Sequence, residues 1–233
     1  DGARDRFLMA DSDKVSLQFP GGNAEFPVVP SVEGPSGIDF STLTKQTGYT
    51  ALDHGFVNTA ATTSTITYID GDEGILRYRG YAIEDVAKNS TFLEVAWLLI
   101  RGELPSAAEL DEFDDEIRHH TLLHEDLKRL FDALPHSAHP MSVLSSAVSA
   151  MSTYYGDSLS VHDPRQIELS TIRLLAKLPV IAAYAHKKSV GQAFLYPDNS
   201  RGFVENFLWL NFGLMAEPYV SNPVLVKALD RLL

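Results

Sequence analysis

The sequence predicts a mainly α-helical protein that starts with a small β-rich region. Two stretches that alternate apolar and polar residues occur before residue 80, and after it apolar residues recur at helical spacing behind helix-capping signals. The 45% of hydrophobic residues suffices for a packed core. Met9 has the character of a natural start, so we expect residues 1–8 to be an N-terminal extension or expression remnant. We further expect a β-rich region at 9–80 and an incomplete large helical domain at 81–233.

Two β-hairpins are predicted in the first region. Residues 15–19 and 24–28 alternate in hydrophobicity and are separated by the turn signal PGGN. Residues 65–69 and 75–78 are rich in β-branched and aromatic side chains and are joined by DGDEG.

Helix signals follow. Thr91 with Glu94 and Ser106 with Glu109 each form a capping box, in which a hydroxyl accepts from a first-turn N–H and a carboxylate reaches back to the cap. Apolar residues then keep a three-four spacing over 110–134. We expect more than one helix over this length, with Thr121 as the cap of the second.

Three later helices are predicted. Small residues on all faces of 141–155 indicate close packing on more than one side. Asp163 and Pro164 open a helix that runs to about Ser189, with a kink at Pro179. We expect a further helix to begin at Ser200.

The last predicted helix begins at Asn222 and Pro223 and is amphipathic up to Leu233. It has no stop signal and finishes on two leucines of its apolar face. We therefore expect a truncated chain, whose missing part covers that face in the whole protein.

Composition argues against several classes of partner. The net charge of −12 disfavours a broad surface for nucleic acid or an anionic membrane. The most apolar stretch, Leu174–Ala185, is far shorter than the roughly 20 residues of a membrane span. There is no cysteine, which excludes disulfides, thiolate metal sites and cysteine nucleophiles and fits a cytoplasmic protein.

Possible metal ligands have a simpler interpretation as structural residues. His120 and His124 are four residues apart, but no third ligand accompanies them, and the pair His136 and His139 has no stronger support. The segment that starts at Asp70 resembles a calcium loop only in its first positions, so a hairpin turn is favoured. We expect no metal site.

One basic pair stands out in this acidic sequence. Arg173 and Lys177 are four residues apart and share a helix face, where they could grip a phosphate. The alternative is a salt bridge with local acidic residues.

Seven collinear blocks resemble the bacterial citrate synthases, over 14–233. They are residues 66–80 (ITYIDGDEGILRYRG), 102–105 (GELP), 120–125 (HTLLHE), 139–141 (HPM), 173–179 (RLLAKLP), 196–199 (YPDN) and 217–219 (EPY). Several blocks in one order are more specific than any single motif.

The resemblance implies a citrate synthase-like large helical domain and an enzyme of the tricarboxylic acid cycle that condenses acetyl-CoA with oxaloacetate to citrate and CoA, without a cofactor. In that family an Asp removes a methyl proton and two His residues assist, and all of these are expected beyond Leu233. No catalytic residue is therefore assigned, and the fragment alone is expected to be inactive. A 2-methylcitrate synthase that uses propionyl-CoA, or a stand-alone helical dimerisation or nucleotide-sensing module, is the alternative.

The resemblance also implies a homodimer through helices 143–155 and 164–189, with a higher oligomer as the alternative. Some bacterial members have an allosteric NADH site, whose matching positions are His120, Thr121, Tyr155, Arg173 and Lys177. His119 and Ala216 depart from those members, which have Arg and Cys there.

Overall fold

The computed structural model describes residues 13–233, so the predicted extension at 1–8 lies outside the described residues. The chain divides into two compact units, one that ends at Ile83 and one that spans Glu84–Leu233. Among the described residues, no helix has both the length and the apolar character that crossing a membrane requires.

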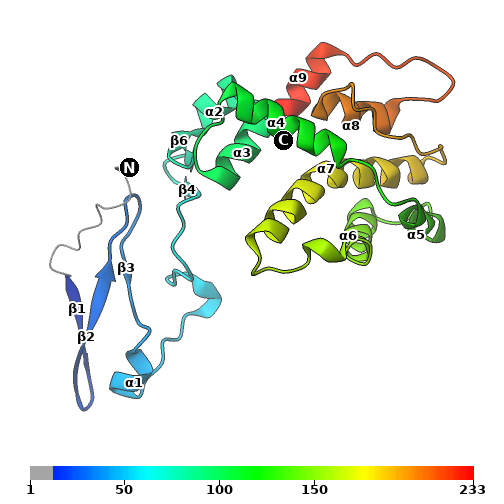
Figure 1. The fold of residues 1–233 in the computed structure, drawn as a ribbon. Coiled ribbons are helices and arrows are strands. Elements are labelled where there is room, and N and C mark those ends of the chain that lie inside the picture. Colours follow the sequence, from blue (N-terminus) through cyan, green and yellow to red (C-terminus); the bar gives the residue numbers. More distant parts are fainter. Residues whose placement is uncertain (1–12) are drawn as a thin grey trace. The chain divides into compact units, whose positions relative to one another are not determined.

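Within the first unit, residues 13–83 form two antiparallel sheets of three strands each (Figure 1). Their strands are β1 (Lys14–Phe19), β2 (Gly22–Val29) and β3 (Gly37–Ile38), then β4 (Thr67–Asp70), β5 (Ile75–Tyr78) and β6 (Tyr81–Ala82). A short helix α1 (Leu43–Thr47) and a 3-10 turn η1 (His54–Phe56) lie between the sheets in sequence. Both predicted hairpins are confirmed.

The register of the first hairpin follows from its turn. Gly21 has a φ of 118°, which glycine adopts without strain, and this tight reversal sets Val15 opposite Phe26. Phe26 is fully buried and packs with Ala24 and Leu43 in a small core.

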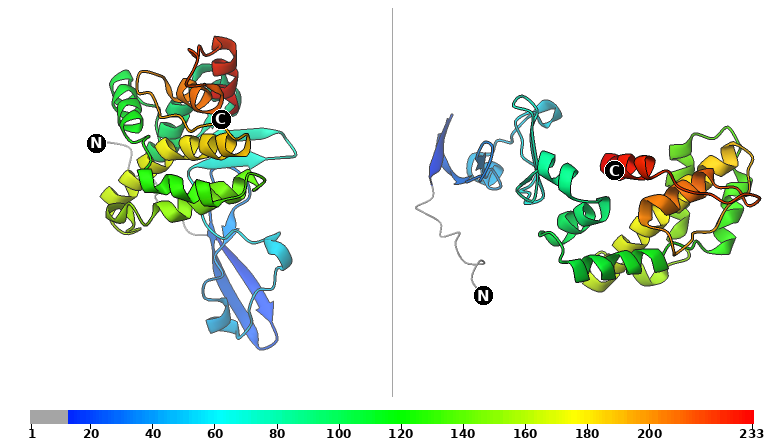
Figure 2. Two further views of the ribbon diagram at one scale, coloured as in Figure 1. Left: turned by 90° about the vertical axis from the view of Figure 1, so that its right-hand side faces the viewer. Right: turned by 90° about the horizontal axis from the view of Figure 1, so that it is seen from above.

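Helices form the second unit, so the chain is mainly α-helical (Figures 1 and 2). They are α2 (Ile83–Asn89), α3 (Phe92–Arg101), α4 (Ala107–His119), α5 (Lys128–Ala133), α6 (Pro140–Met151), α7 (Pro164–Ser189), α8 (Phe203–Phe212) and α9 (Pro223–Leu232). Two 3-10 turns, η2 (Glu125–Leu127) and η3 (Gly156–Ser158), precede α5 and α7.

Helix α7 passes through both cores of this unit. Its first half contributes Ile172 and Ala176 to a core with α3 and α4, and its second half contributes Ile181 and Tyr184 to a larger core with α5, α6 and α8. Figures 1 and 2 show α6 and α8 on opposite sides of α7. Its start is confirmed, because Asp163 accepts from the N–H groups of two first-turn residues.

Both predicted capping boxes are confirmed. The Thr91 hydroxyl accepts from the Glu94 N–H while the Glu94 carboxylate accepts from the Thr91 N–H, and Ser106 and Glu109 form the same pair of bonds. Each box satisfies helix N–H groups that have no partner within the helix.

Three predicted boundaries are wrong. Thr121 caps no helix, because its hydroxyl donates to the carbonyl of Arg118 (2.8 Å) and thereby closes the end of α4. Helix α6 ends at Met151 rather than residue 155. Helix α8 starts at Phe203 rather than Ser200, because Ser200 is held in a turn by Asp198.

The apolar face of α9 is exposed. Val224 is 74% exposed and Leu232 82% exposed, and no residue of α9 is buried. Asn222 caps this helix as predicted, since its side chain accepts from the Val224 N–H.

Candidate functional site

The structure brings the predicted anion-site residues together from three segments of the second unit. Tyr155 precedes η3, Arg173 and Lys177 lie one turn apart on α7, and the segment of His120 and Thr121 follows α4. Both cations lie over the Tyr155 ring, with the Arg173 guanidinium 4.7 Å and the Lys177 ammonium 5.0 Å from its centroid. We call Tyr155, Asp157, Arg173 and Lys177 the Tyr155 cluster.

Arg173 is held by an acidic partner that the sequence did not single out. Its Nη2 lies 3.0 Å from Oδ2 of Asp157, its Nη1 bonds the other carboxylate oxygen, and Nη1 also donates to the Ser158 hydroxyl (2.9 Å). This bidentate pair lowers the pKa of Asp157 and raises that of Arg173. The local salt bridge that we gave as the alternative is therefore present.

Lys177 is bound differently. Only 3% of it is exposed, and its ammonium donates to the carbonyl oxygens of His120 and Leu122. Burial, followed by the positive charge of Arg173, lowers the pKa of Lys177 to about 8. Lys177 thus fastens the segment after α4 to α7, and its donors point at backbone oxygens.

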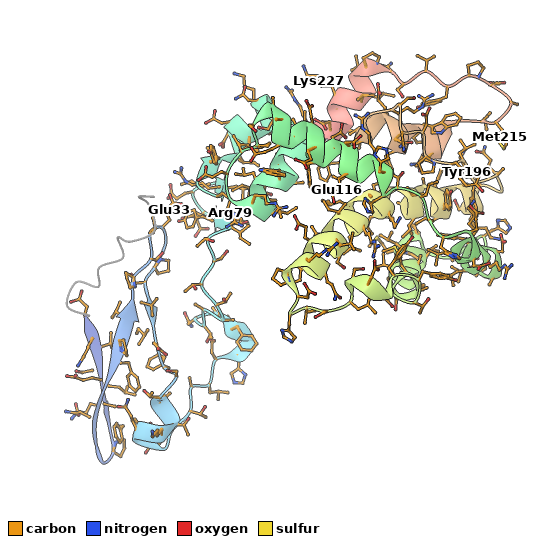
Figure 3. The ribbon with its side chains drawn as sticks, in the orientation of Figure 1. Glu33, Arg79, Glu116, Tyr196, Met215 and Lys227 are labelled. Carbon is orange, nitrogen blue, oxygen red and sulfur yellow. The ribbon has the colours of Figure 1, made fainter. Side chains whose placement is uncertain are left out.

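His120 and Thr121 turn their side chains toward their own helix. The His120 ring nitrogen Nδ1 lies 2.8 Å from the Glu116 carbonyl, and the Thr121 hydroxyl bonds the end of α4. Figure 3 labels Glu116 on α4. The backbone of this segment, rather than its side chains, meets the Tyr155 cluster.

A shallow pocket of about 100 Å³ adjoins the Arg173 side of the cluster. Hydroxyl groups and apolar side chains from α6, η3 and α7 line it together with Tyr155 and Arg173: Val148, Met151, Ser152, Ser158, Leu159, Ser170 and Leu174. The hydroxyls of Ser152, Ser158 and Ser170 donate to backbone carbonyls, so the Arg173 guanidinium is the group of this lining that suits an anion.

The histidines that were candidate metal ligands have structural partners. His124 Nδ1 accepts from the Asp126 N–H and its ring lies 4.6 Å from the Tyr154 ring, while His139 caps α6. His136 Nδ1 lies 2.6 Å from the Lys188 carbonyl. Over residues 13–233, no three His, Asp or Glu side chains are grouped as a metal would require.

Asp70 closes the second hairpin. Its Oδ1 accepts from the N–H groups of Asp72 (3.1 Å) and Glu73 (3.0 Å), the pattern of an Asx turn. The structure therefore uses this acidic loop as a turn.

Sequence reasoning missed a second polar cluster on the same unit. Lys128 donates to both carboxylate oxygens of Glu125 at 3.0 Å and lies 3.8 Å from the centroid of the Tyr196 ring, whose hydroxyl donates to Glu125 (3.0 Å). Tyr196 belongs to the loop after α7 (Figure 3), 71 residues from Glu125. The spacing of Glu125 and Lys128 was the only local signal for this cluster.

Comparisons with known proteins agree on one family. The family model described as "Citrate synthase, C-terminal domain" matches residues 55–233. Citrate synthase 1 of Mycobacterium tuberculosis is 60% identical over 225 residues, which cover 96% of this chain and 52% of that protein.

Solved structures give the same result. The citrate synthase of Pyrobaculum aerophilum matches 98% of this chain and 50% of its own, with 27% identity and a TM-score of 0.68. A ternary complex of the Thermoplasma acidophilum citrate synthase with carboxymethyl coenzyme A and oxaloacetate shares the fold at 20% identity and a TM-score of 0.69, over 78% of this chain and 46% of its own. This chain spans about half the length of the relatives that it matches.

Proposed function

We propose that this chain, which belongs to the citrate synthase family, is the N-terminal part of a cytoplasmic enzyme that condenses acetyl-CoA with oxaloacetate to citrate and CoA. The observation that carries the proposal is the 60% identity to Citrate synthase 1 along nearly the whole chain. The Thermoplasma complex, whose ligands are a CoA derivative and oxaloacetate, supports the choice of substrates.

The catalytic groups of this enzyme are proposed to lie in the part of its relatives that this chain does not span. In the same proposal, residues 9–80 are the β-rich region and residues 81–233 part of the large helical domain. The exposed apolar face of α9 supports the proposal that residues 81–233 are only part of the helical domain. Exposed leucines on one helix face are typical of a surface that another segment covers.

The preferred acyl donor distinguishes a citrate synthase from a 2-methylcitrate synthase. Thiol release by the whole protein, measured with oxaloacetate and either acetyl-CoA or propionyl-CoA, should show the higher kcat/KM with acetyl-CoA. A higher kcat/KM with propionyl-CoA would assign the protein as a 2-methylcitrate synthase instead.

We further propose a homodimer through α6 and α7. The face of α6 away from the core exposes small side chains and Met141, which is 61% exposed. These small residues are Ser142, Ser145, Ser146 and Ser149. Small residues permit two helices to approach closely across a symmetry axis.

The Tyr155 cluster is proposed as an anion site for an allosteric nucleotide such as NADH. The supporting observation is that the guanidinium of Arg173 borders both the Tyr155 ring and the hydroxyl-lined pocket. We expect Arg173→Ala to weaken NADH binding about tenfold or more, since it removes a bidentate phosphate partner. Unchanged binding of NADH by the variant in a fluorescence titration would refute this role.

A further inference from the structure

Asp157 occupies the position on Arg173 that an anionic ligand would take. Its two carboxylate oxygens face the two terminal nitrogens of the guanidinium, which is the geometry that a phosphate also adopts with arginine. The carbon of the same guanidinium lies over the Tyr155 ring, 4.7 Å from its centroid. Asp157 therefore fills the edge that the two terminal nitrogens form.

The other cation of the cluster does not compete for Asp157. Lys177 is buried and donates to two carbonyl oxygens, so it makes no ion pair with Asp157 and contributes its charge to the local potential. A ligand anion that entered the pocket would accordingly contend with Asp157 for Arg173.

Asp157 is placed where it can be displaced. Its side chain is 61% exposed, whereas that of Arg173 is 14% exposed, and it belongs to the three-residue turn η3 that starts at Gly156. Ion pairs with an exposed partner are weak because water solvates the carboxylate once it is released. The Ser158 hydroxyl accepts from Arg173 and donates to the Tyr155 carbonyl, so it keeps Arg173 in place when Asp157 leaves.

We propose that Asp157 is an internal competitor that fills the anion position on Arg173, so that a phosphate-bearing ligand binds only by displacing it. The inference rests on the anion site proposed above and adds a regulatory contact to it. A ligand must then break the ion pair between Asp157 and Arg173, and the free energy of that ion pair lowers the affinity of the ligand.

Removal of this competitor is the direct test, with pyrophosphate as the probe. Titrations of the chain followed by calorimetry should give about twofold to fivefold tighter binding for Asp157→Asn than for the unaltered chain, the gain that loss of a partly exposed ion pair allows. Asp157→Asn combined with Arg173→Gln should lose that gain.

Two controls separate competition from other effects. Asp111→Asn removes the same charge from the exposed face of α4, and Ser158→Ala loosens the same turn without removing a charge. Neither should tighten binding. An equal gain in either control, or no gain in Asp157→Asn, would overturn the proposal.

The outcome is independent of the condensation reaction. Pyrophosphate binding that follows this pattern would support the Asp157 contact even if the protein failed to release thiol from acetyl-CoA. Conversely, an active enzyme in which Asp157→Asn leaves affinity unchanged would keep the proposed reaction and reject the internal competitor.

Discussion

Lys177 shows how a buried cation is accommodated in this fold. Two backbone carbonyls accept from its ammonium, which satisfies hydrogen-bonding capacity that burial would otherwise leave unpaired. The loss of water and the neighbouring positive charge of Arg173 still outweigh these bonds, so the pKa of Lys177 is lowered to about 8. The charged form of Lys177 therefore lowers the free energy of unfolding.

This arrangement predicts a pH dependence of stability. Between about pH 8 and the ordinary lysine value of 10.5, the unfolded chain binds more protons at Lys177 than the folded chain does. The free energy of unfolding should therefore rise with pH in that window, by on the order of 3 kcal/mol when complete, and this group's contribution is lowest below pH 8. Below pH 8 both states are protonated.

Urea unfolding of the unaltered chain and of Lys177→Met at several pH values tests this expectation. The difference in unfolding free energy between the two should shift in favour of the unaltered chain from pH 8 to 10.5. A constant difference for Lys177→Met would mean that its pKa is not lowered.

The sequence predicted part of this site. The four-residue spacing of Arg173 and Lys177 predicted a shared helix face, and the structure confirms it. The two side chains have different bonding partners, and both partners come from other chain segments. Asp157 lies 16 residues from Arg173, and the His120 carbonyl lies 57 residues from Lys177. No local pattern contains that information.

At the scale of elements, capping chemistry was the reliable signal. Capping residues mark the starts of α3, α4, α7 and α9 in sequence and in the structure. The errors at Thr121 and Ser200 have one cause. Hydroxyl side chains bond helix ends and turns as readily as they cap helix starts, and sequence does not say which they will do.

The apolar face of α9 gives a prediction for this element. Because Leu232 is 82% exposed, Leu232→Gln should change the free energy of unfolding of this chain by less than about 0.5 kcal/mol. Leu98→Ala, at a fully buried position of α3, should cost about 2 to 5 kcal/mol. Chemical denaturation of both variants measures the contrast.

A large loss of stability in Leu232→Gln would contradict the exposed face. It would indicate that the chain covers these leucines with its own residues, and the proposal that α9 packs against a further part of the protein would lose its support.

At the scale of the molecule, α7 explains why the helical unit holds together. Its two halves belong to different cores, so Ile172 packs with α3 and α4 while Ile181 packs with α5 and α6. The sequence predicted α7 and its length from Asp163, Pro164 and the apolar run. It did not predict which helices share each core, because those contacts join residues that are dozens of positions apart.

Family membership and the extent of the chain together indicate where the residues for condensation lie. The chain belongs to the citrate synthase family and spans about half the length of its matched relatives. We propose that the residues for condensation lie in the other half.

Thiol release from acetyl-CoA in the presence of oxaloacetate, catalysed by the 233-residue chain alone, tests this claim most directly. The preparation must first be verified as the 25.7 kDa chain by intact mass. We predict a rate equal to that of a reaction without protein. Citrate formation above that background by the verified chain would show that these residues contain a working active site, and would contradict the account.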